Sequence, residues 1–196
     1  RREWRHFQMD ELKGSTVTVI GQGAIGQAIV TRLEGFEVET IGVRYTPEKG
    51  GPAYRVIGFD HEDFHAALAE TEYLVLASPL TETTRGLVDR EAFDTLGPDA
   101  FLINIARGGL VETDALVDAV RSQFLRGAAL DVTDPEPLPS DHPLWTFDNV
   151  FITPHNAGHS PEHWPRLADI VAENVRLLDE TDALDGLENL VSTPDA

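Results

Sequence analysis

The chain has 196 residues and carries 34 Asp and Glu against 15 Lys and Arg, so its formal net charge is −19. A charge of this size and sign repels nucleic acid and anionic lipid, and we therefore exclude nucleic acid and membranes as partners. The sequence holds no Cys, which excludes disulfides and thiolate metal sites, and no apolar run approaches a membrane helix. We expect a cytoplasmic protein, long enough for one sizeable core.

The acidic surface also bears on the conditions in which the protein works. Lys13 and Lys49 are the only lysines, and all other basic residues are arginines. An acid-rich, lysine-poor surface is expected in molar salt, where repulsion between charges is screened to about 3 Å. The composition thus favours a halophilic source, with an acidic protein from ordinary salt as the alternative.

Short apolar runs rich in β-branched residues alternate with longer amphipathic runs, which is typical of βαβ units and a parallel sheet. The predicted strands are 16–20, 38–43, 55–58, 73–77, 100–104, 128–132 and 149–153. Four helices are predicted. The first follows the first strand and has Ile25, Ile29 and Leu33 on one face, and the second begins after the N-cap Asp60. The third begins near Glu112, and the fourth runs from about Glu162 to Leu178. This order predicts a doubly wound parallel sheet with helices on both faces, a Rossmann-type α/β fold.

The domain organisation follows from the remaining segments. Residues 45–53 and 133–143 are rich in Pro or Gly and are predicted to be irregular loops. We expect 1–13 to be an arm or helix entering from something upstream, 14–178 to be the dinucleotide-binding domain, and 179–196 to be a polar C-terminal tail.

A glycine-rich turn, Gly21-Gln-Gly23-Ala-Ile-Gly26, follows the first predicted strand directly and opens the first helix. Glycines allow the tight turn, the close approach of backbone to a pyrophosphate, and the packing of helix on strand. The unpaired N–H groups of the helix then face the phosphates. The alternative is a glycine-rich turn without a ligand, but the strand–turn–helix context predicts a dinucleotide site.

The end of the second strand bears on the choice of cofactor. NAD enzymes usually carry an acid about 20 residues after the glycine turn, bonded to the ribose hydroxyls. Here Arg44 stands eighteen residues after Gly26, and no acid lies between Ile41 and Pro47. An arginine pairs with a 2′-phosphate, and the Thr46 hydroxyl adds a further bond. We predict NADP(H), with NAD(H) as the alternative if the arginine only stacks on adenine.

Three chemically active residues follow three successive strands. Arg107 comes after the fifth strand, Glu136 after the sixth and His155 after the seventh. Carboxyl ends of parallel strands meet at one edge of the sheet, where a bound nicotinamide would lie. Each residue alone has a structural explanation, as a surface ion pair, a loop acid or a helix-entry residue. Together, a cation, an acid and an imidazole predict binding of an α-keto acid and proton transfer to it.

The order of these motifs resembles the D-isomer-specific 2-hydroxyacid dehydrogenases over nearly the whole chain. The motifs that carry the resemblance are Gly21–Gly26, Ser78-Pro-Leu-Thr81, Asn104-Ile-Ala-Arg-Gly-Gly109, Asp131-Val-Thr-Asp-Pro-Glu-Pro-Leu138, His142-Pro-Leu-Trp145 and Pro154-His-Asn-Ala-Gly158. The resemblance implies reversible hydride transfer between a nicotinamide cofactor and a small 2-keto or 2-hydroxy acid, in a homodimer.

The resemblance also implies residue roles. Arg107 would bind the carboxylate and carbonyl of the substrate, His155 would be the acid and base, and Glu136 would hold its ring. Asp131 would lie near the nicotinamide carboxamide, and the amides of residues 24 and 25 near the pyrophosphate. The predicted cofactor-binding residues are Gly21, Gly23, Ala24, Ile25, Gly26, Arg44, Tyr45, Thr46, Ser78, Pro79, Thr84, Ile105, Asp131, His155 and Ala157.

The sequence departs from the family at three points, one of which, Asn156 after the histidine where an apolar residue is commoner, has no obvious consequence. Arg44 stands where most members have Asp, which favours NADP over NAD. The family's chain normally begins with about half of a separate substrate lobe, and no such segment precedes Arg1. We therefore expect this chain by itself to bind cofactor and to turn over poorly.

Three other interpretations fit the sequence less well. The resemblance extends to corepressors that sense NADH, against which the retained Arg107, Glu136 and His155 argue. A relative of adenosylhomocysteinase would not carry the 154–158 motif. The spacing of His155, His159 and His163 is that of metal ligands on a helix, but Gly158 and Pro161 interrupt any helix there. We therefore predict no metal site.

Overall fold

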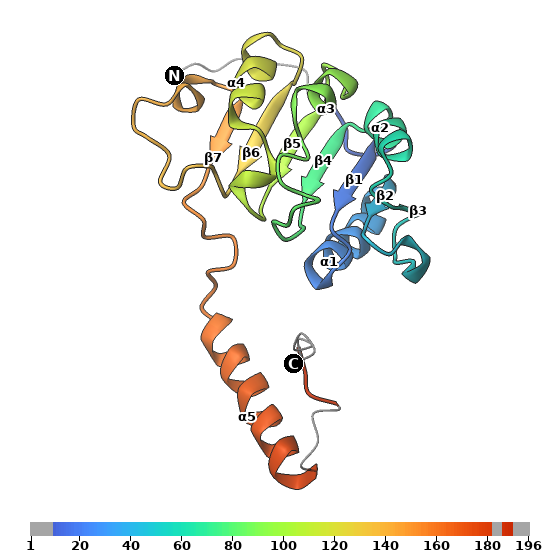
Figure 1. The fold of residues 1–196 in the computed structure, drawn as a ribbon, viewed down its shortest axis with the longest axis vertical. Coiled ribbons are helices and arrows are strands. Elements are labelled where there is room, and N and C mark those ends of the chain that lie inside the picture. Colours follow the sequence, from blue (N-terminus) through green and yellow to red (C-terminus); the bar gives the residue numbers. More distant parts are fainter. Residues whose placement is uncertain (1–9, 182–185, 190–196) are drawn as a thin grey trace. The chain divides into compact units, whose positions relative to one another are not determined.

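The computed structural model describes residues 10–181 and 186–189, and Figure 1 shows its fold. Most of the expected N-terminal arm and most of the expected tail lie outside these residues. The chain divides into two compact units, Arg1–His155 and Asn156–Ala196, and each is described by itself.

The first unit is built on a sheet of seven parallel strands in the order β3-β2-β1-β4-β5-β6-β7 (Figure 1). The strands are β1 (Thr16–Ile20), β2 (Glu39–Val43), β3 (Arg55–Ile57), β4 (Tyr73–Leu76), β5 (Phe101–Asn104), β6 (Gly127–Leu130) and β7 (Val150–Ile152). β1 and β4 are largely buried, as their Val, Ile and Leu residues require. The predicted doubly wound α/β sheet is confirmed.

Helices cover the two faces of this sheet. On one face, Val30 of α1 (Ala24–Leu33) packs with Val17 and Val19 of β1. On the other, the main core combines strand residues with buried side chains of α2 (His61–Ala69), α3 (Arg90–Thr95) and α4 (Thr113–Arg121). Full burial of a Leu or Phe side chain contributes about 1.5–3 kcal/mol, so this larger core dominates the stability of the unit.

Two helices differ from the sequence-based expectation. Ile25 was grouped with Ile29 and Leu33, yet it is 63% exposed. The side that meets the strand is occupied by Gly26, where a Cβ would lie 1.7 Å from the carbonyl oxygen of Gly21. The short helix α3 was not predicted, although Asp89 caps it by accepting a hydrogen bond from the N–H of Ala92. The predicted N-cap of α2, Asp60, is confirmed.

The second unit contains α5 (His163–Thr181), which continues past the predicted end at Leu178. Its exposed apolar side chains recur every three or four residues, at Trp164, Leu167, Val171, Val175 and Leu178. No helix among the described residues is long and apolar enough to span a membrane.

Candidate active site

The glycine turn joins β1 to α1 at the carboxyl edge of the sheet. Gly21 has a φ of +98°, and a Cβ there would lie 2.7 Å from the carbonyl carbon of Ala77. A Cβ at Gly23 would meet no described atom within 4 Å. No described side chain caps α1, so the first-turn N–H groups stay available. The turn therefore offers an open backbone cradle to an anion.

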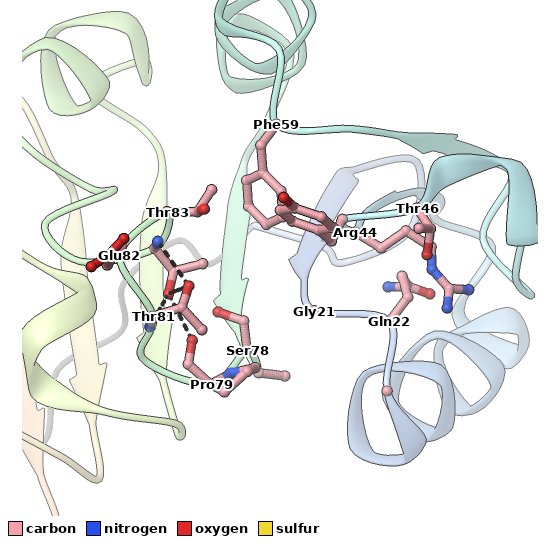
Figure 2. Close-up of a pocket in the computed structure, with 14 residues that line it drawn as sticks. Gly21, Gln22, Arg44, Thr46, Phe59, Ser78, Pro79, Thr81, Glu82 and Thr83 are labelled. Atoms are coloured by element: carbon pink, nitrogen blue, oxygen red, sulfur yellow. Dashed lines mark hydrogen bonds between the residues drawn. The ribbon is translucent and has the colours of Figure 1, made fainter. Parts of the chain in front are cut away.

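A cavity of about 620 Å³ opens beside this turn. Figure 2 shows Ser78 and Thr81–Thr83, after β4, on one side and Arg44, Thr46 and Gln22 on the other. The residues that line it are Gly21, Gln22, Gly23, Arg44, Tyr45, Thr46, Phe59, Ala77, Ser78, Pro79, Thr81, Glu82, Thr83 and Thr84. The cavity thus lies at the ends of β1, β2 and β4, at the switch point of the sheet where open α/β folds bind ligands.

Two residues that line this cavity carry a buried polar atom without a hydrogen-bond partner among the described residues. The Ser78 hydroxyl oxygen and Oε1 of Gln22 are buried and have no hydrogen-bond partner among the described residues. Such groups cost about 1–3 kcal/mol each when unsatisfied, so a ligand or water that bonds them would be stabilised. The cradle and these polar atoms together fit a dinucleotide.

Arg44 lines this cavity beyond the end of β2. Its backbone N–H donates to the carbonyl of Ile57, and its Nη1 donates to the carbonyl of Gly50 at 2.6 Å. The side chain is half-buried beside Thr46 (Figure 2). One N–H of the guanidinium holds the loop at Gly50, and the remaining donors, for which the described residues offer no hydrogen-bond partner, can bind an anionic oxygen.

The other predicted cofactor residues divide among three places. Ala24, Ile25 and Gly26 form the first turn of α1, whereas Ile105 and Asp131 directly follow the ends of β5 and β6. Asp131 is buried and accepts a hydrogen bond from the Thr153 hydroxyl at 2.5 Å. Ala157 belongs to the second unit, so its cofactor contact stays a prediction.

His155 and Glu136 are in direct contact. Nδ1 of His155 lies 2.9 Å from Oε2 of Glu136, whose Oε1 accepts from the backbone N–H of Thr133 at 3.0 Å. The φ of His155 is +52°, in the left-handed region, and its N–H donates to the carbonyl of Asp131 at 2.8 Å. A non-glycine residue rarely adopts this backbone, and such strain gathers at functional sites. The bond to Glu136 leaves Nε2 of the ring as the nitrogen able to act on a substrate.

The charge state of Glu136 reflects this arrangement. Burial, the largest single effect, acts to raise its pKa, but the hydrogen bonds from His155 and Thr133 and the charges of His155 and Arg107 outweigh it. The pKa of Glu136 is therefore lowered, and the group stays an anion. The charge of Arg107 is the smallest of these effects.

Arg107 is held by a buried amide. The side chain of Asn104 donates to the carbonyl of Arg107 at 2.9 Å and accepts from the N–H of Ala106 at 3.1 Å. The next residue, Gly108, packs so closely that a Cβ would lie 2.0 Å from the carbonyl carbon of Thr133. The loops after β5 and β6 are thus locked together, which connects Arg107 to the backbone that bonds Glu136.

Comparison with known proteins decides the family. Residues 1–157 match the family model described as D-isomer specific 2-hydroxyacid dehydrogenase, NAD binding domain. The chain belongs to this family. As a 2-hydroxyacid dehydrogenase domain, it binds NAD or NADP.

Individual relatives agree with this assignment. A glyoxylate reductase of Thermofilum pendens is 39% identical over 84% of this chain and 48% of its own length. A family member from Aeromonas salmonicida superimposes with a TM-score of 0.83 at 31% identity, covering 96% of this chain and 59% of the other. A Xanthobacter autotrophicus dehydrogenase, solved with NADPH and MES, has a TM-score of 0.82 at 32% identity, covering 95% and 75%. The chain spans about half the length of the curated relatives it matches.

A second cavity of this dehydrogenase domain, about 370 Å³, lies between the loops after β6 and β7. Its lining residues are Asp131, Thr133, Glu136, Pro137, Leu138, Trp145, Ile152, Thr153, Pro154 and His155. It lies directly beside the His155–Glu136 pair, and most of its wall is apolar.

Several site residues were not singled out from the sequence. Asn104 and Thr133 hold Arg107 and Glu136, and Gln22 and Phe59 line the cofactor cavity. Phe59 follows the third strand closely, so the strand-end rule that found Arg44 would have found it too. The backbone N–H of Thr133 carries no sequence signal, because any residue other than proline supplies it.

Proposed function

We propose that this chain forms the cofactor-binding half of an oxidoreductase that acts on small D-2-hydroxy acids and the corresponding 2-keto acids. The observation that carries this proposal is the His155–Glu136 pair, 2.9 Å apart, at the same sheet edge as the glycine cradle. The nicotinamide cofactor supplies or accepts the hydride. A keto acid, one hydride and one proton make the hydroxy acid, so the protein must deliver the proton.

In this mechanism Nε2 of His155 donates the proton to the keto oxygen, and takes it back in the oxidation. Glu136 fixes the ring through Nδ1 and supplies a negative charge beside its protonated form. Arg107 pairs with the carboxylate of the substrate. The close packing of Gly108 on Thr133 joins the loops that carry Arg107 and Glu136, which supports orientation of the substrate.

The experiment that tests this assignment is His155→Ala in the intact protein. We expect reduction of glyoxylate and hydroxypyruvate to fall by about 10²–10⁴-fold, because general acid catalysis contributes that much. Cofactor affinity should stay within a few-fold, since the glycine cradle is unchanged. His159→Ala, in the second unit, is the control. Turnover by His155→Ala at the rate of the control would disprove the proposed role.

We further propose that NADP(H) is preferred over NAD(H). Arg44 and Thr46 line the cavity at the end of β2, and the free guanidinium donors match a 2′-phosphate. The similar Xanthobacter dehydrogenase was solved with NADPH. Arg44→Asp should therefore weaken NADPH binding and favour NADH, as measured by calorimetric titration. Tighter binding of NADH than NADPH by the unsubstituted protein would reject the proposal.

Relatives named glyoxylate reductase favour an enzyme over a cofactor-sensing corepressor, and suggest glyoxylate as the first substrate to assay.

A homodimer and a cytoplasmic location are part of the same proposal. Sedimentation of the intact protein tests the first, and cell fractionation tests the second.

A further inference from the structure

Two histidines of α2 and a glutamate of α3 converge on the surface of the first unit. The rings of His61 and His65, one helical turn apart, are stacked with their centroids 4.3 Å apart. Oε1 of Glu91 lies 3.4 Å from Nε2 of His61. One potential ligand atom from each residue lies within 4.8 Å of the other two. None of the three lines either cavity of the candidate active site.

The distance between His61 and Glu91 fits the coordination of a small transition-metal ion, and the ligand atom of His65 lies within 4.8 Å of both. Zn²⁺ binds histidine nitrogen and carboxylate oxygen at about 2.0–2.2 Å, and a tetrahedral ion separates such ligands by roughly 3.3 Å. The contact between His61 and Glu91 already has this length. Imidazole with one carboxylate suits zinc, nickel and copper, whereas magnesium and calcium prefer oxygen ligands alone.

The hydrogen bonds of Thr95 fix which nitrogen of His65 is free. The Thr95 hydroxyl donates its single hydrogen to the carbonyl of Glu91 at 2.8 Å. Towards Nδ1 of His65, also 2.8 Å away, the hydroxyl must then accept. Nδ1 therefore carries the proton and Nε2 carries the lone pair. Metal-binding histidines typically have their other nitrogen held in this way.

We propose that His61, His65 and Glu91 form a binding site for a divalent transition-metal ion of the zinc type, with water completing the coordination. An ordinary ion pair between His61 and Glu91 accounts for the contact between those two residues, whereas the proposed site also uses Nε2 of His65. A bound ion would join α2 to α3. Because it binds the folded arrangement, it would raise the stability of the domain.

The test is calorimetric titration of the whole chain with Zn²⁺, with Mg²⁺ as the hard-cation comparison. The variant is His61→Ala/His65→Ala. The matched control is His159→Ala/His163→Ala, which removes two histidines with the same spacing from the second unit. We expect the unsubstituted chain and the control to bind one Zn²⁺ equally, and the α2 variant to lose this binding. At ten times the Kd, Zn²⁺ should raise the Tm by roughly 3–6 °C where the site is intact.

Two single substitutions keep the test decisive if the double variant does not fold. His61→Ala removes an exposed side chain, and Glu91→Gln keeps the size of the side chain but removes its charge. Each should weaken Zn²⁺ binding at least several-fold. Equal Zn²⁺ affinity in these variants and in the unsubstituted chain would overturn the proposal. So would an equal Tm rise with Mg²⁺, which would indicate general charge screening.

Discussion

The carboxylate of Glu136 connects His155, the proposed acid–base residue, to the backbone of Thr133. One oxygen contacts the ring of His155 and the other accepts from the N–H of Thr133. Burial opposes ionisation, but these bonds and nearby charges lower the pKa of Glu136. A carboxyl with a lowered pKa contributes stability above its ordinary range, and this contribution is lost as pH falls through the lowered value. The pair should therefore stay assembled in mildly acidic solution.

This charge should govern the pH profile of keto-acid reduction. In Glu136→Gln the amide still reaches the ring, but the protonated ring loses the anion 2.9 Å away. We expect the pH at which reduction declines on the alkaline side to move to lower pH, as measured by kcat/KM from pH 5 to 9. Glu70→Gln, which removes an exposed acid at the end of α2, serves as the control. An unmoved profile would remove Glu136 from the mechanism.

The strands of this sheet position the site through the loops that leave their carboxyl ends. β5 and β6 pair in register, so their following loops start side by side. The loops then meet where Gly108 packs on the backbone of Thr133. Asn104, which is buried, bonds both sides of the turn that presents Arg107. The separation of the two backbone segments that carry Arg107 and Glu136 is thus set by this packing.

Gly108→Ala tests this element directly. The added Cβ would lie 2.0 Å from the carbonyl carbon of Thr133, so the two loops must separate. Overpacking of this kind costs about 1–3 kcal/mol. We expect a lower free energy of unfolding in urea and a fall in kcat, with cofactor affinity almost unchanged because the glycine cradle is elsewhere. Gly97→Ala, whose Cβ would meet no described atom, should change neither. Full activity in Gly108→Ala would contradict the loop-locking argument.

At the scale of the molecule, charge is the dominant feature. Acids exceed bases by 19 among 196 residues. Arg55, Arg90, Arg126 and Arg176 already pair with acids at exposed positions. Such surface pairs contribute about 0–1 kcal/mol each, so their loss in salt costs little. The unpaired excess of carboxylates, by contrast, destabilises the compact state through repulsion.

Salt should therefore stabilise the fold. The screening length falls from about 10 Å at 0.1 M to about 3 Å at 1 M, so repulsion between neighbouring surface acids is largely removed. We expect the Tm to rise steeply as KCl increases from tenths molar to molar, and NaCl of equal ionic strength to act alike. A Tm that does not change with KCl concentration would reject adaptation to high salt.

The sequence alone determined the features that depend on local pattern. The strands, the glycine turn and the cap at Asp60 were predictable, because periodicity, turn chemistry and capping act within a few residues. The order of motifs also identified the family, and the position of Arg107, Glu136 and His155 after successive strands placed them at one sheet edge.

Only the tertiary structure decided the contacts between separate loops and helices. It brought Glu136 to Nδ1 of His155, locked Gly108 against Thr133, and exposed Ile25. It also brought Glu91 to the histidines of α2, a cluster that helical spacing alone could not complete. The exposure of Ile25 follows from the close packing of Gly26 on the carbonyl oxygen of Gly21. For the three contacts the physical reason is common: these distances depend on how elements far apart in the chain pack, and a local sequence pattern carries no record of that packing.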